Sequence, residues 1–402
     1  MFVLKAVYCR IFQGVFRLAL PFLPYREPKI LNSCKELGVV AKSKNIKSVL
    51  IVTDKGVYNC GLTKSAEEEL EKNYVKVFVF SETLANPTVK NVEDAVKIYK
   101  KYGCEALIAV GGGSAMDCAK ALGARIAYPK KSLEQMKGIL RVLRKLPPLF
   151  AIPTTAGTGS ETTLAAVVTD SEKYYKYALM SFPLIPHYAV LDAEMTVSLP
   201  PEMTATTGMD ALTHAVEAYI GNSTTKETKK LALDSIKLVF ENIENAYKNG
   251  NDKITRANML LAAYKAGVAF SKSYVGYIHA MAHSLGGQYG TPHGLANAVI
   301  MPYVLEAYGS RIYKKLHRAA VAAGISNDFD TDEEGAKKFI SAVKDLNRKM
   351  GIPNKICGIK KEDIENMAKK AEKEANPIYP VPKLFTQKEL EKFYYKFADW
   401  SE

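Results

Sequence analysis

Apolar runs and helical stretches alternate along the first half of the chain. The runs SVLIVTD, VKVFVF, ALIAV and LFAIPT are short, apolar and rich in β-branched residues. Between them, the segments 64–73 and 89–102 and the segment that begins at Ser114 have the apolar spacing of helices. This alternation, which extends over residues 48–192, predicts a parallel sheet covered by helices.

The strand pattern stops after LDAEMTVSLPP. From Pro201 onward nearly every segment has helical periodicity, for example KETKKLALDSIKLVFENIENAYK and DEEGAKKFISAVKDLNRKM. A chain of 402 residues is long enough for two domains. We expect an α/β domain at 1–195 that includes an N-terminal arm, and an all-helical domain at 196–402. A ligand is expected in the cleft between the two.

The N-terminal arm, MFVLKAVYCRIFQGVFRLALPFLP, is strongly apolar, but three basic residues interrupt it: Lys5, Arg10 and Arg17. A membrane-spanning helix or a signal peptide needs a longer uncharged run. We therefore expect an amphipathic helix packed on the protein, without stable membrane insertion. Contact with a membrane surface is the alternative.

The charge balance is basic, with 55 Lys and Arg against 42 Asp and Glu and a formal net charge of +13. The lysines are spread among acidic neighbours and no nucleic-acid motif accompanies them, so we expect no nucleic-acid partner. A cationic surface would help to attract an anionic cofactor. The 6 cysteines form no CxxC pair, which indicates reduced thiols in a cytoplasmic protein.

Two loops of small residues follow predicted strands. In ALIAVGGGSAMD, the glycines and Ser114 stand between a strand and a helix, where backbone N–H groups favour a phosphate. The G-x-G-x-x-G fingerprint is absent because Met116 occupies the position of its third glycine, and a tight turn without a ligand also fits the pattern. The second loop is PTTAGTGSE. Two such loops favour a dinucleotide-binding site.

Asp54 ends the run SVLIVTD and is a candidate to bind the adenosine ribose of the dinucleotide. Its charge would repel a 2′-phosphate, which favours NAD(H) over NADP(H). Asp54 precedes the glycine loop, so this is not the common Rossmann order. A turn-capping role for Asp54 fits the sequence equally well.

Two windows hold five candidate metal ligands. Asp210 and His214 in GMDALTHAVEAY have helical i, i+4 spacing, as do His279 and His283 in HAMAHSLGGQYG, and His293 in TPHG lies where a helix begins. An isolated histidine is most often a hydrogen-bonded structural residue. Five candidates in two windows instead favour a divalent transition metal. Spacing alone leaves open which of the five bind it.

With these motifs in view, the chain resembles the iron-dependent (group III) alcohol dehydrogenases, which are related to glycerol dehydrogenase and dehydroquinate synthase. The similarity extends from Leu50 to Ala398. It includes the motifs VTDKG, NPT, GGGSAMDCAK, PTTAGTGSE, GMDALTHAVEAY, HAMAHSLG, TPHGLANA and ANP. The resemblance implies a two-domain fold like that of dehydroquinate synthase, in which a dinucleotide-binding α/β domain precedes a helical domain for metal and substrate.

The resemblance also implies roles for single residues. Asp210, His214, His279 and His293 match the metal ligands, which leaves His283 as a catalytic proton carrier beside the nicotinamide. Phe270 matches an aromatic residue of the substrate-pocket wall. The cofactor-binding positions are Asp54, Asn86, Gly112, Gly113, Ser114, Asp117, Thr154, Thr155 and Lys176.

The function implied is a metal-dependent alcohol dehydrogenase or aldehyde reductase. It would transfer a hydride between a primary alcohol or diol and NAD(P), with the metal polarising the substrate oxygen. We expect Fe²⁺, with Zn²⁺ as the alternative, NAD(H) in preference to NADP(H), and a homodimer.

Two departures and three alternatives qualify this expectation. The segment PFLPYREPKILNSCKELG, which follows the amphipathic arm, takes the place of an extended strand and F-G-x-G turn common in the family, and Lys272 replaces a frequent asparagine. Lys272 leaves open a hydroxyacid or oxoacid dehydrogenase or transhydrogenase. A dehydroquinate synthase-type lyase needs basic residues near the metal, and the two windows contain no Lys or Arg. A metal-stabilised binding protein would have no need of two anion loops.

Overall fold

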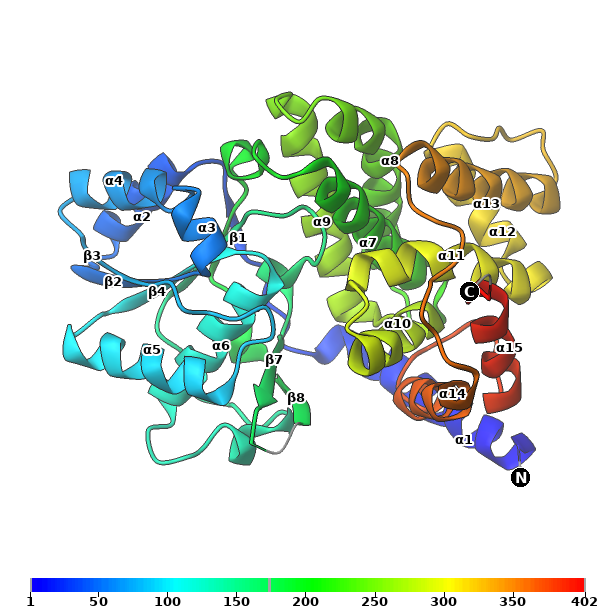
Figure 1. Cartoon of the computed structure of the whole chain (residues 1–402), viewed down its shortest axis with the longest axis horizontal. Helices are drawn as coiled ribbons and strands as arrows, with labels where there is room; N and C mark the ends of the chain where they lie inside the picture. The colour runs from blue at the N-terminus through cyan, green and yellow to red at the C-terminus, as the bar shows by residue number, and fades with distance from the viewer. Residues whose placement is uncertain (1, 173–174, 401–402) are drawn as a thin grey trace. The chain divides into compact units, whose positions relative to one another are not determined.

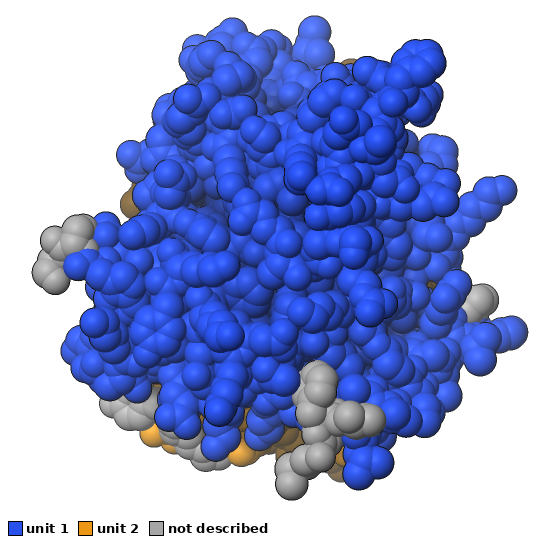
Figure 2. All heavy atoms as spheres, turned by 90° about the vertical axis from the view of Figure 1, so that its right-hand side faces the viewer, with its two compact units in different colours: residues 1–23, 200–402 blue, residues 24–199 orange. Residues whose placement is uncertain are grey.

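The computed structural model describes residues 2–172 and 175–400, which divide into two compact units. Unit 2 is Pro24–Leu199, and unit 1 combines the residues up to Leu23 with those from Pro200 onward (coloured separately in Figure 2). The sequence analysis had assigned the N-terminal arm to the α/β domain. In the structure the arm belongs to the helical unit, because its contacts are made there.

Unit 2 contains a six-stranded parallel sheet in the order β1-β9-β6-β4-β2-β3. Its strands are β1 Lys29–Leu31, β2 Ser48–Val52, β3 Lys76–Phe80, β4 Ala106–Gly111, β6 Leu149–Pro153 and β9 Tyr188–Val190. The runs predicted as strands form β2, β3, β4 and β6. Three of these, β2, β4 and β6, are buried along their whole length, as expected for a parallel sheet covered on both faces.

Helices cover both faces of this sheet (Figure 1). The helices are α2 Cys34–Ser43, α3 Lys55–Asn59, α4 Lys64–Lys72, α5 Val89–Lys101 and α6 Gly113–Ala127. Alternate residues of β2 serve different cores. Leu50 and Val52 pack with α5 and α6, whereas Val49 and Ile51 pack with α2 and α4. The alternation of strands and helices predicted from the sequence is confirmed.

A second, three-stranded sheet in unit 2 was not predicted. Its order is β5-β8-β7, and it consists of β5 Gly138–Ile139, β7 Ala165–Asp170 and β8 Tyr175–Met180. Strands β7 and β8 pair antiparallel.

Short 3₁₀ helices occur in both units, at Leu20–Phe22, Glu134–Met136, Ser160–Thr162, Phe182–Leu184, Ala193–Thr196 and Gly309–Arg311.

Unit 1 is helical, as predicted. Its helices are α1 Phe2–Ala19, α7 Pro201–Ile220, α8 Lys226–Lys248, α9 Lys253–Ser273, α10 Tyr277–Tyr289, α11 His293–Tyr308, α12 Tyr313–Ala322, α13 Asp332–Lys349, α14 Lys361–Ala375 and α15 Gln387–Phe397. Capping boxes at Thr225, Thr331 and Thr386 start three of them. Helix α7 is buried from Gly208 to Ile220, so it forms the centre of the unit. Among the described residues no helix is long and apolar enough to cross a membrane.

Candidate metal centre

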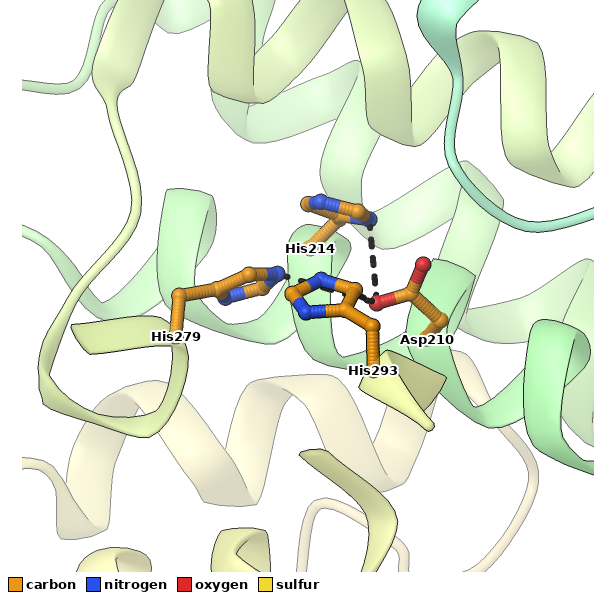
Figure 3. A group of neighbouring side chains, drawn as sticks. All are labelled: Asp210, His214, His279 and His293. Carbon is orange, nitrogen blue, oxygen red and sulfur yellow. Dashed lines mark ion pairs between the residues drawn. The ribbon is translucent and has the colours of Figure 1, made fainter. Parts of the chain in front are cut away.

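Three helices of unit 1 direct four side chains toward one point (Figure 3). Helix α7 provides Asp210 and His214, α10 provides His279, and α11 provides His293 at its first residue. One ligand atom from each residue lies within 4.8 Å of the other three. From Asp210 Oδ1, the distances are 3.8 Å to His214 Nδ1, 3.7 Å to His279 Nε2 and 3.4 Å to His293 Nε2. Ligands that share an ion at about 2.1 Å are about 3 to 4 Å apart, so this spacing suits a metal.

The hydrogen bonding of these residues is incomplete in a way that suits a cation. Asp210, His214 and His279 are buried, and His293 is partly exposed. Within the described residues, His214 Nδ1 and His279 Nε2 are buried without a hydrogen-bond partner. An unpaired buried nitrogen is costly, and a metal ion would pair both. Three imidazoles and one carboxylate are donors that suit Fe²⁺ or Zn²⁺.

Glu217 fixes the orientation of His279, and the sequence analysis missed it. Its carboxylate accepts the backbone N–H of Gly276 at 2.7 Å and that of Ile278 at 2.8 Å. It also lies 2.7 Å from His279 Nδ1, which must donate because the carboxylate is an acceptor. That tautomer leaves the lone pair of Nε2 facing Asp210. A carboxylate that orients a ligating histidine in this way is common around protein metals.

The position of the Glu217 carboxylate also explains why a glycine, Gly276, precedes α10. A Cβ atom built on Gly276 would lie 2.6 Å from Glu217 Oε1, so no larger residue fits without displacing the carboxylate. Glu217 is seven residues after Asp210 and three after His214, on the same face of α7. That spacing was a signal that could have identified it.

The ionisation of three of the four residues matches what a metal requires. Burial would raise the pKa of Asp210, but the surrounding imidazoles of His214, His293 and His279 hold it below its ordinary value. Burial lowers the pKa of His214 well below its usual range and that of His293 to about 4, so both are neutral ligands. Burial also disfavours a charge on His279, yet the neighbouring carboxylates of Asp210 and Glu217 raise its pKa to about 9, so a metal would displace a proton from this imidazole. The two carboxylates therefore stabilise a positive charge at this point.

Asn297 also contacts two of the candidate ligands, and the sequence spacing did not reveal it. Its amide nitrogen donates to Asp210 Oδ1 at 2.7 Å and lies 3.1 Å from His293 Nε2. Asn297 is buried, one turn after His293 on α11. It therefore restrains both the carboxylate of Asp210 and the partly exposed imidazole of His293.

His283 lies next to the four residues but does not join them. Its ring stacks on that of His293 with the centroids 5.1 Å apart. Its Nδ1 is 2.6 Å from Glu374 Oε1, which also accepts the hydroxyl of Tyr379 at 2.8 Å. Burial would raise the pKa of Glu374, but His283 and the hydrogen bonds lower it. Glu374 and Tyr379 were not predicted, since they lie more than 90 residues away in the sequence.

Phe270 and Lys272 on α9 differ in their surroundings. The ring of Phe270 stacks on His214 at 4.1 Å with an interplanar angle of 14°, so it forms part of the wall around the candidate site. Lys272 forms an ion pair with Glu227 at 2.7 Å. Its charge is therefore already partly neutralised within unit 1.

Six of the predicted cofactor residues lie in unit 2 at the carboxyl ends of β2, β4 and β6, which are neighbours in the sheet: Asp54, Gly112, Gly113, Ser114, Thr154 and Thr155. Gly111 has a φ of 150°, which requires glycine, and a Cβ atom on it would lie 3.7 Å from Asp54 Oδ2. A Cβ atom on Gly112 would lie 3.5 Å from Thr155 Oγ1, and Thr154 N donates to Gly111 O at 3.1 Å. The two loops and Asp54 thus meet at the carboxyl-terminal end of the sheet.

Other predicted cofactor residues make contacts within unit 2. Lys176 donates to Asn86 at 2.7 Å, although the two residues are 90 positions apart, and the Ser114 hydroxyl donates to Ala85 O. Gly113 opens α6, and a Cβ atom on it would lie 3.4 Å from Thr158 Cγ2. The contact between Gly113 and Thr158 places the first loop beside the second.

Asp54 and Asp117 both have structural partners. Asp54 Oδ1 accepts the N–H of Val57 at 2.9 Å and caps α3, while its Oδ2 faces the glycine loop. The capping interpretation is therefore observed, and one oxygen remains for a ligand. Asp117 accepts Val167 N at 3.2 Å and the Ser160 hydroxyl at 3.4 Å, and burial raises its pKa to about 6. Its contacts link α6 to β7 and to the second loop.

Comparison with known protein families gives a match over most of the chain. Residues 31–193 match the family described as iron-containing alcohol dehydrogenase, and residues 204–398 match the C-terminal region of the Fe-containing alcohol dehydrogenase family. The first region contains the predicted cofactor residues, and the second contains the four candidate metal ligands.

Individual proteins give a consistent result. The chain is 39% identical over 355 residues to alcohol dehydrogenase 4 of Saccharomyces cerevisiae, covering 86% of this chain and 91% of the yeast protein. It is 35% identical over 342 residues to the NAD-dependent methanol dehydrogenase of Bacillus methanolicus, with 85% and 90% covered. The crystal structure of a 1,3-propanediol oxidoreductase is similar with a TM-score of 0.88 and 33% identity, over 92% of this chain and 98% of that one.

Proposed function

The chain belongs to the iron-containing alcohol dehydrogenase family, and we propose that it interconverts a primary alcohol or diol and its aldehyde with NAD(H). The reaction class follows from the family, whose members with similar sequences are named as alcohol and diol oxidoreductases. We also propose the metal ligands, the cofactor and the roles of single residues.

The single observation that carries this proposal is the buried cluster of Asp210, His214, His279 and His293. Two of its nitrogens have no other partner within the described residues. We assign these four residues as the ligands of Fe²⁺, with Zn²⁺ as the alternative. A metal bound there supplies a Lewis acid that polarises the substrate oxygen.

A bound nicotinamide cofactor would supply the hydride chemistry. In this assignment the backbone of Gly112, Gly113 and Ser114 and the hydroxyls of Thr154 and Thr155 bind its phosphates, at the edge of the sheet where the two loops meet. Asn86, Asp117 and Lys176 complete the cofactor-binding set, with Asn86 and Lys176 joined by a hydrogen bond.

We assign proton transfer to His283. Its Nδ1–H donates to Glu374, which leaves Nε2 as the acceptor for a proton from the substrate hydroxyl. Glu374 stabilises the imidazolium that then forms. The Tyr379 hydroxyl donates to the same oxygen of Glu374, Oε1, and holds the carboxylate in place. Phe270 excludes water from one side of His214.

The preference for NAD(H) over NADP(H) rests on Asp54. Its second carboxylate oxygen faces the glycine loop and is not used in capping α3. A negative charge there accepts hydrogen bonds from a ribose diol and repels a 2′-phosphate. The similarity to an NAD-dependent methanol dehydrogenase supports the same preference.

An alcohol is favoured over an acid as the substrate. The hydroxyacid alternative depended on Lys272, and its ion pair with Glu227 leaves less charge to bind a carboxylate. The windows GMDALTHAVEAY and HAMAHSLGGQYG contain no Lys or Arg, which disfavours a dehydroquinate synthase-type lyase. A cytoplasmic location and a homodimer remain predictions, and the absence of a CxxC pair among the 6 cysteines suits a reducing compartment.

A substrate screen tests this function. The purified protein, kept anaerobic with added Fe²⁺, is offered primary alcohols, diols, their aldehydes and hydroxyacids with each of NAD(H) and NADP(H). We expect net NADH formation from an alcohol or diol. Turnover of hydroxyacids alone would contradict the proposed substrate class, and the absence of net NADH formation from every substrate would contradict the proposed reaction.

A further inference from the structure

The segment between α14 and α15 contains Tyr379, whose hydroxyl holds Glu374, and this segment has little regular structure of its own. Residues 377–382 form neither helix nor strand, and they include three prolines, which have no N–H group to donate. The backbone carbonyls of such a segment are not paired by a helix or a sheet, so they need donors from elsewhere. The position of Tyr379 therefore depends on the groups that bind this backbone.

Gln13 of α1 is one of these groups. Its side chain is buried, and its Nε2 donates to Tyr379 O at 2.8 Å and to Pro377 O at 3.2 Å. Its Oε1 accepts a hydrogen bond from the Arg10 guanidinium at 2.8 Å, which fixes the orientation of the amide. The NH₂ group thus uses both of its hydrogens on the segment. A side chain without that group would remove a donor from each of the two carbonyls.

Other residues of α1 attach to the same region. The Arg10 guanidinium also donates to Val381 O at 2.7 Å. Lys5 forms an ion pair with Glu372 of α14, the helix that carries Glu374 and lies beside α1 in Figure 1. Helix α1 therefore contacts both the segment that contains Tyr379 and the helix that contains its carboxylate partner.

Tyr379 connects this segment to the proposed proton carrier. Its hydroxyl donates to Glu374 Oε1 at 2.8 Å, and the same oxygen lies 2.6 Å from His283 Nδ1. Burial and the charge of Glu374 raise the pKa of Tyr379 well above its usual range, so the hydroxyl keeps its proton and remains the donor. Three hydrogen bonds in series therefore connect Gln13 to His283.

Aromatic rings support Tyr379 from the same side. Phe16 of α1 packs edge-on against Tyr274 with the centroids 5.0 Å apart, and the Tyr274 ring lies 6.3 Å from that of Tyr379. Tyr274 has a φ of 62° and a ψ of −179°, a backbone conformation that essentially only glycine adopts without strain. Such a conformation persists only where surrounding contacts hold it. The ring of Phe16 provides one of those contacts.

We propose that α1 positions the proton carrier: Gln13 fixes the backbone of Tyr379, and the tyrosine hydroxyl thereby keeps His283 in place. Glu374 is the link between the hydroxyl and the imidazole. This inference rests on the proposed function, which assigns proton transfer to His283. Gln13 is a positioning residue, because it acts through Tyr379. Its loss should slow the chemical step and leave the binding of metal and cofactor intact, since other residues bind these groups.

Steady-state kinetics of the full chain test the proposal. Gln13→Met keeps the length of the side chain but donates no hydrogen bond. With Fe²⁺ added and NAD⁺ as the oxidant, primary alcohols and 1,3-propanediol are the substrates. We expect kcat to fall about tenfold, while the KM for the alcohol and the affinities for Fe²⁺ and NADH change by less than about twofold.

Tyr379→Phe shows whether Gln13 acts through this tyrosine. Phenylalanine keeps the ring but lacks the hydroxyl that holds Glu374, so kcat should fall in this variant as well. If Gln13 acts through Tyr379, the double variant Gln13→Met, Tyr379→Phe should be no slower than Tyr379→Phe alone. A purely structural role for Gln13 would instead give two independent losses that multiply.

Asn242→Leu is the matched control within unit 1. Its side chain is buried like that of Gln13, and its amide donates to Leu238 O at 2.8 Å on α8, a helix that carries no residue of the proposed site. The control should lower the unfolding temperature as Gln13→Met does, yet leave kcat unchanged. If Gln13→Met does not fold, Gln13→Asn replaces it, because the shorter amide cannot reach both carbonyls.

Hydrogen exchange separates this proposal from the proposed function. The backbone amides of residues 374–382 should exchange about tenfold faster in Gln13→Met than in the wild type, and at the wild-type rate in Asn242→Leu. A wild type that oxidises no alcohol would contradict the proposed function, and the exchange rates would then decide whether α1 fixes the segment. Unchanged exchange at 374–382 in Gln13→Met would overturn the positioning role. In an active enzyme, so would an unchanged kcat in Gln13→Met or losses that multiply in the double variant.

Discussion

The Oε2 atom of Glu217 lies 2.7 Å from Nδ1 of His279, and this contact determines which nitrogen of His279 faces Asp210. One carboxylate from α7 thereby joins the start of α10 to the orientation of a candidate ligand. In the proposed metal centre, the orientation of a ligand therefore depends on a residue that need not touch the metal.

Glu217→Gln should separate this positioning role from direct ligation. The amide can still accept one backbone N–H, but its NH₂ group would oppose the N–H of His279 and favour the wrong tautomer. We expect metal affinity to fall about 10- to 100-fold and the unfolding free energy to fall by about 1 to 3 kcal/mol. Metal titration of the apoprotein and urea unfolding measure the two effects. Glu306→Gln, at an exposed ion pair, is the matched control, and an unchanged metal affinity in Glu217→Gln would refute the positioning role.

Asp54→Ser should relax the preference for NAD(H). A serine keeps a side-chain oxygen that can cap α3 but removes the charge that faces the glycine loop. We expect the ratio of kcat/KM for NADP⁺ to that for NAD⁺ to rise about tenfold, which corresponds to about 1.4 kcal/mol. Asp94→Ser removes an exposed charge from α5 in the same unit and should leave the ratio unchanged. Equal ratios in wild type and Asp54→Ser would show that Asp54 only caps the helix.

His187 should make stability depend on pH. Burial lowers its pKa from 6.5 to about 4, while its Nδ1 accepts the N–H of Leu149 at 3.2 Å. The unfolded chain therefore binds a proton at a higher pH than the folded protein does. The stability contributed by neutral His187 is fully present above pH 6.5 and is lost progressively as the pH falls toward 4.

The variant His187→Gln isolates this contribution. Glutamine retains an acceptor for Leu149 but does not titrate. Urea unfolding at about pH 7 and about pH 5 should show a smaller loss of stability in the variant than in the wild type. Identical losses in the two proteins would mean that His187 contributes nothing to the pH dependence.

Much of the fold could be predicted from the sequence because local patterns decide it. The strands β2, β4 and β6 are continuous apolar runs that need cover on both faces, and the helices of unit 1 have clear periodicity. The small sheet was missed because its strands are short and partly exposed, so they lack a continuous apolar run. The residues of the arm indicated an amphipathic helix. Its attachment through Arg10 and Gln13 depends on carbonyls near residue 380, which no local pattern reveals.

The candidate site, too, could be predicted from the sequence only in part. The i, i+4 spacing of Asp210 and His214 indicated shared chemistry, and the structure brings them together with His279 and His293. Spacing did not separate His283 from the four, whereas the structure pairs it with Glu374. Contacts across about 90 residues arise from tertiary packing, so they lie beyond sequence periodicity.

The dependence of turnover on metal tests the central claim most directly. The protein is stripped of metal under anaerobic conditions and assayed for NADH formation from primary alcohols and 1,3-propanediol, before and after addition of Fe²⁺ or Zn²⁺. We predict that wild-type turnover is lost on stripping and returns with metal. His279→Ala should bind NADH as the wild type does, yet bind metal weakly and remain inactive with either ion. Full NADH formation by the stripped wild-type protein, or normal turnover by His279→Ala, would contradict the account.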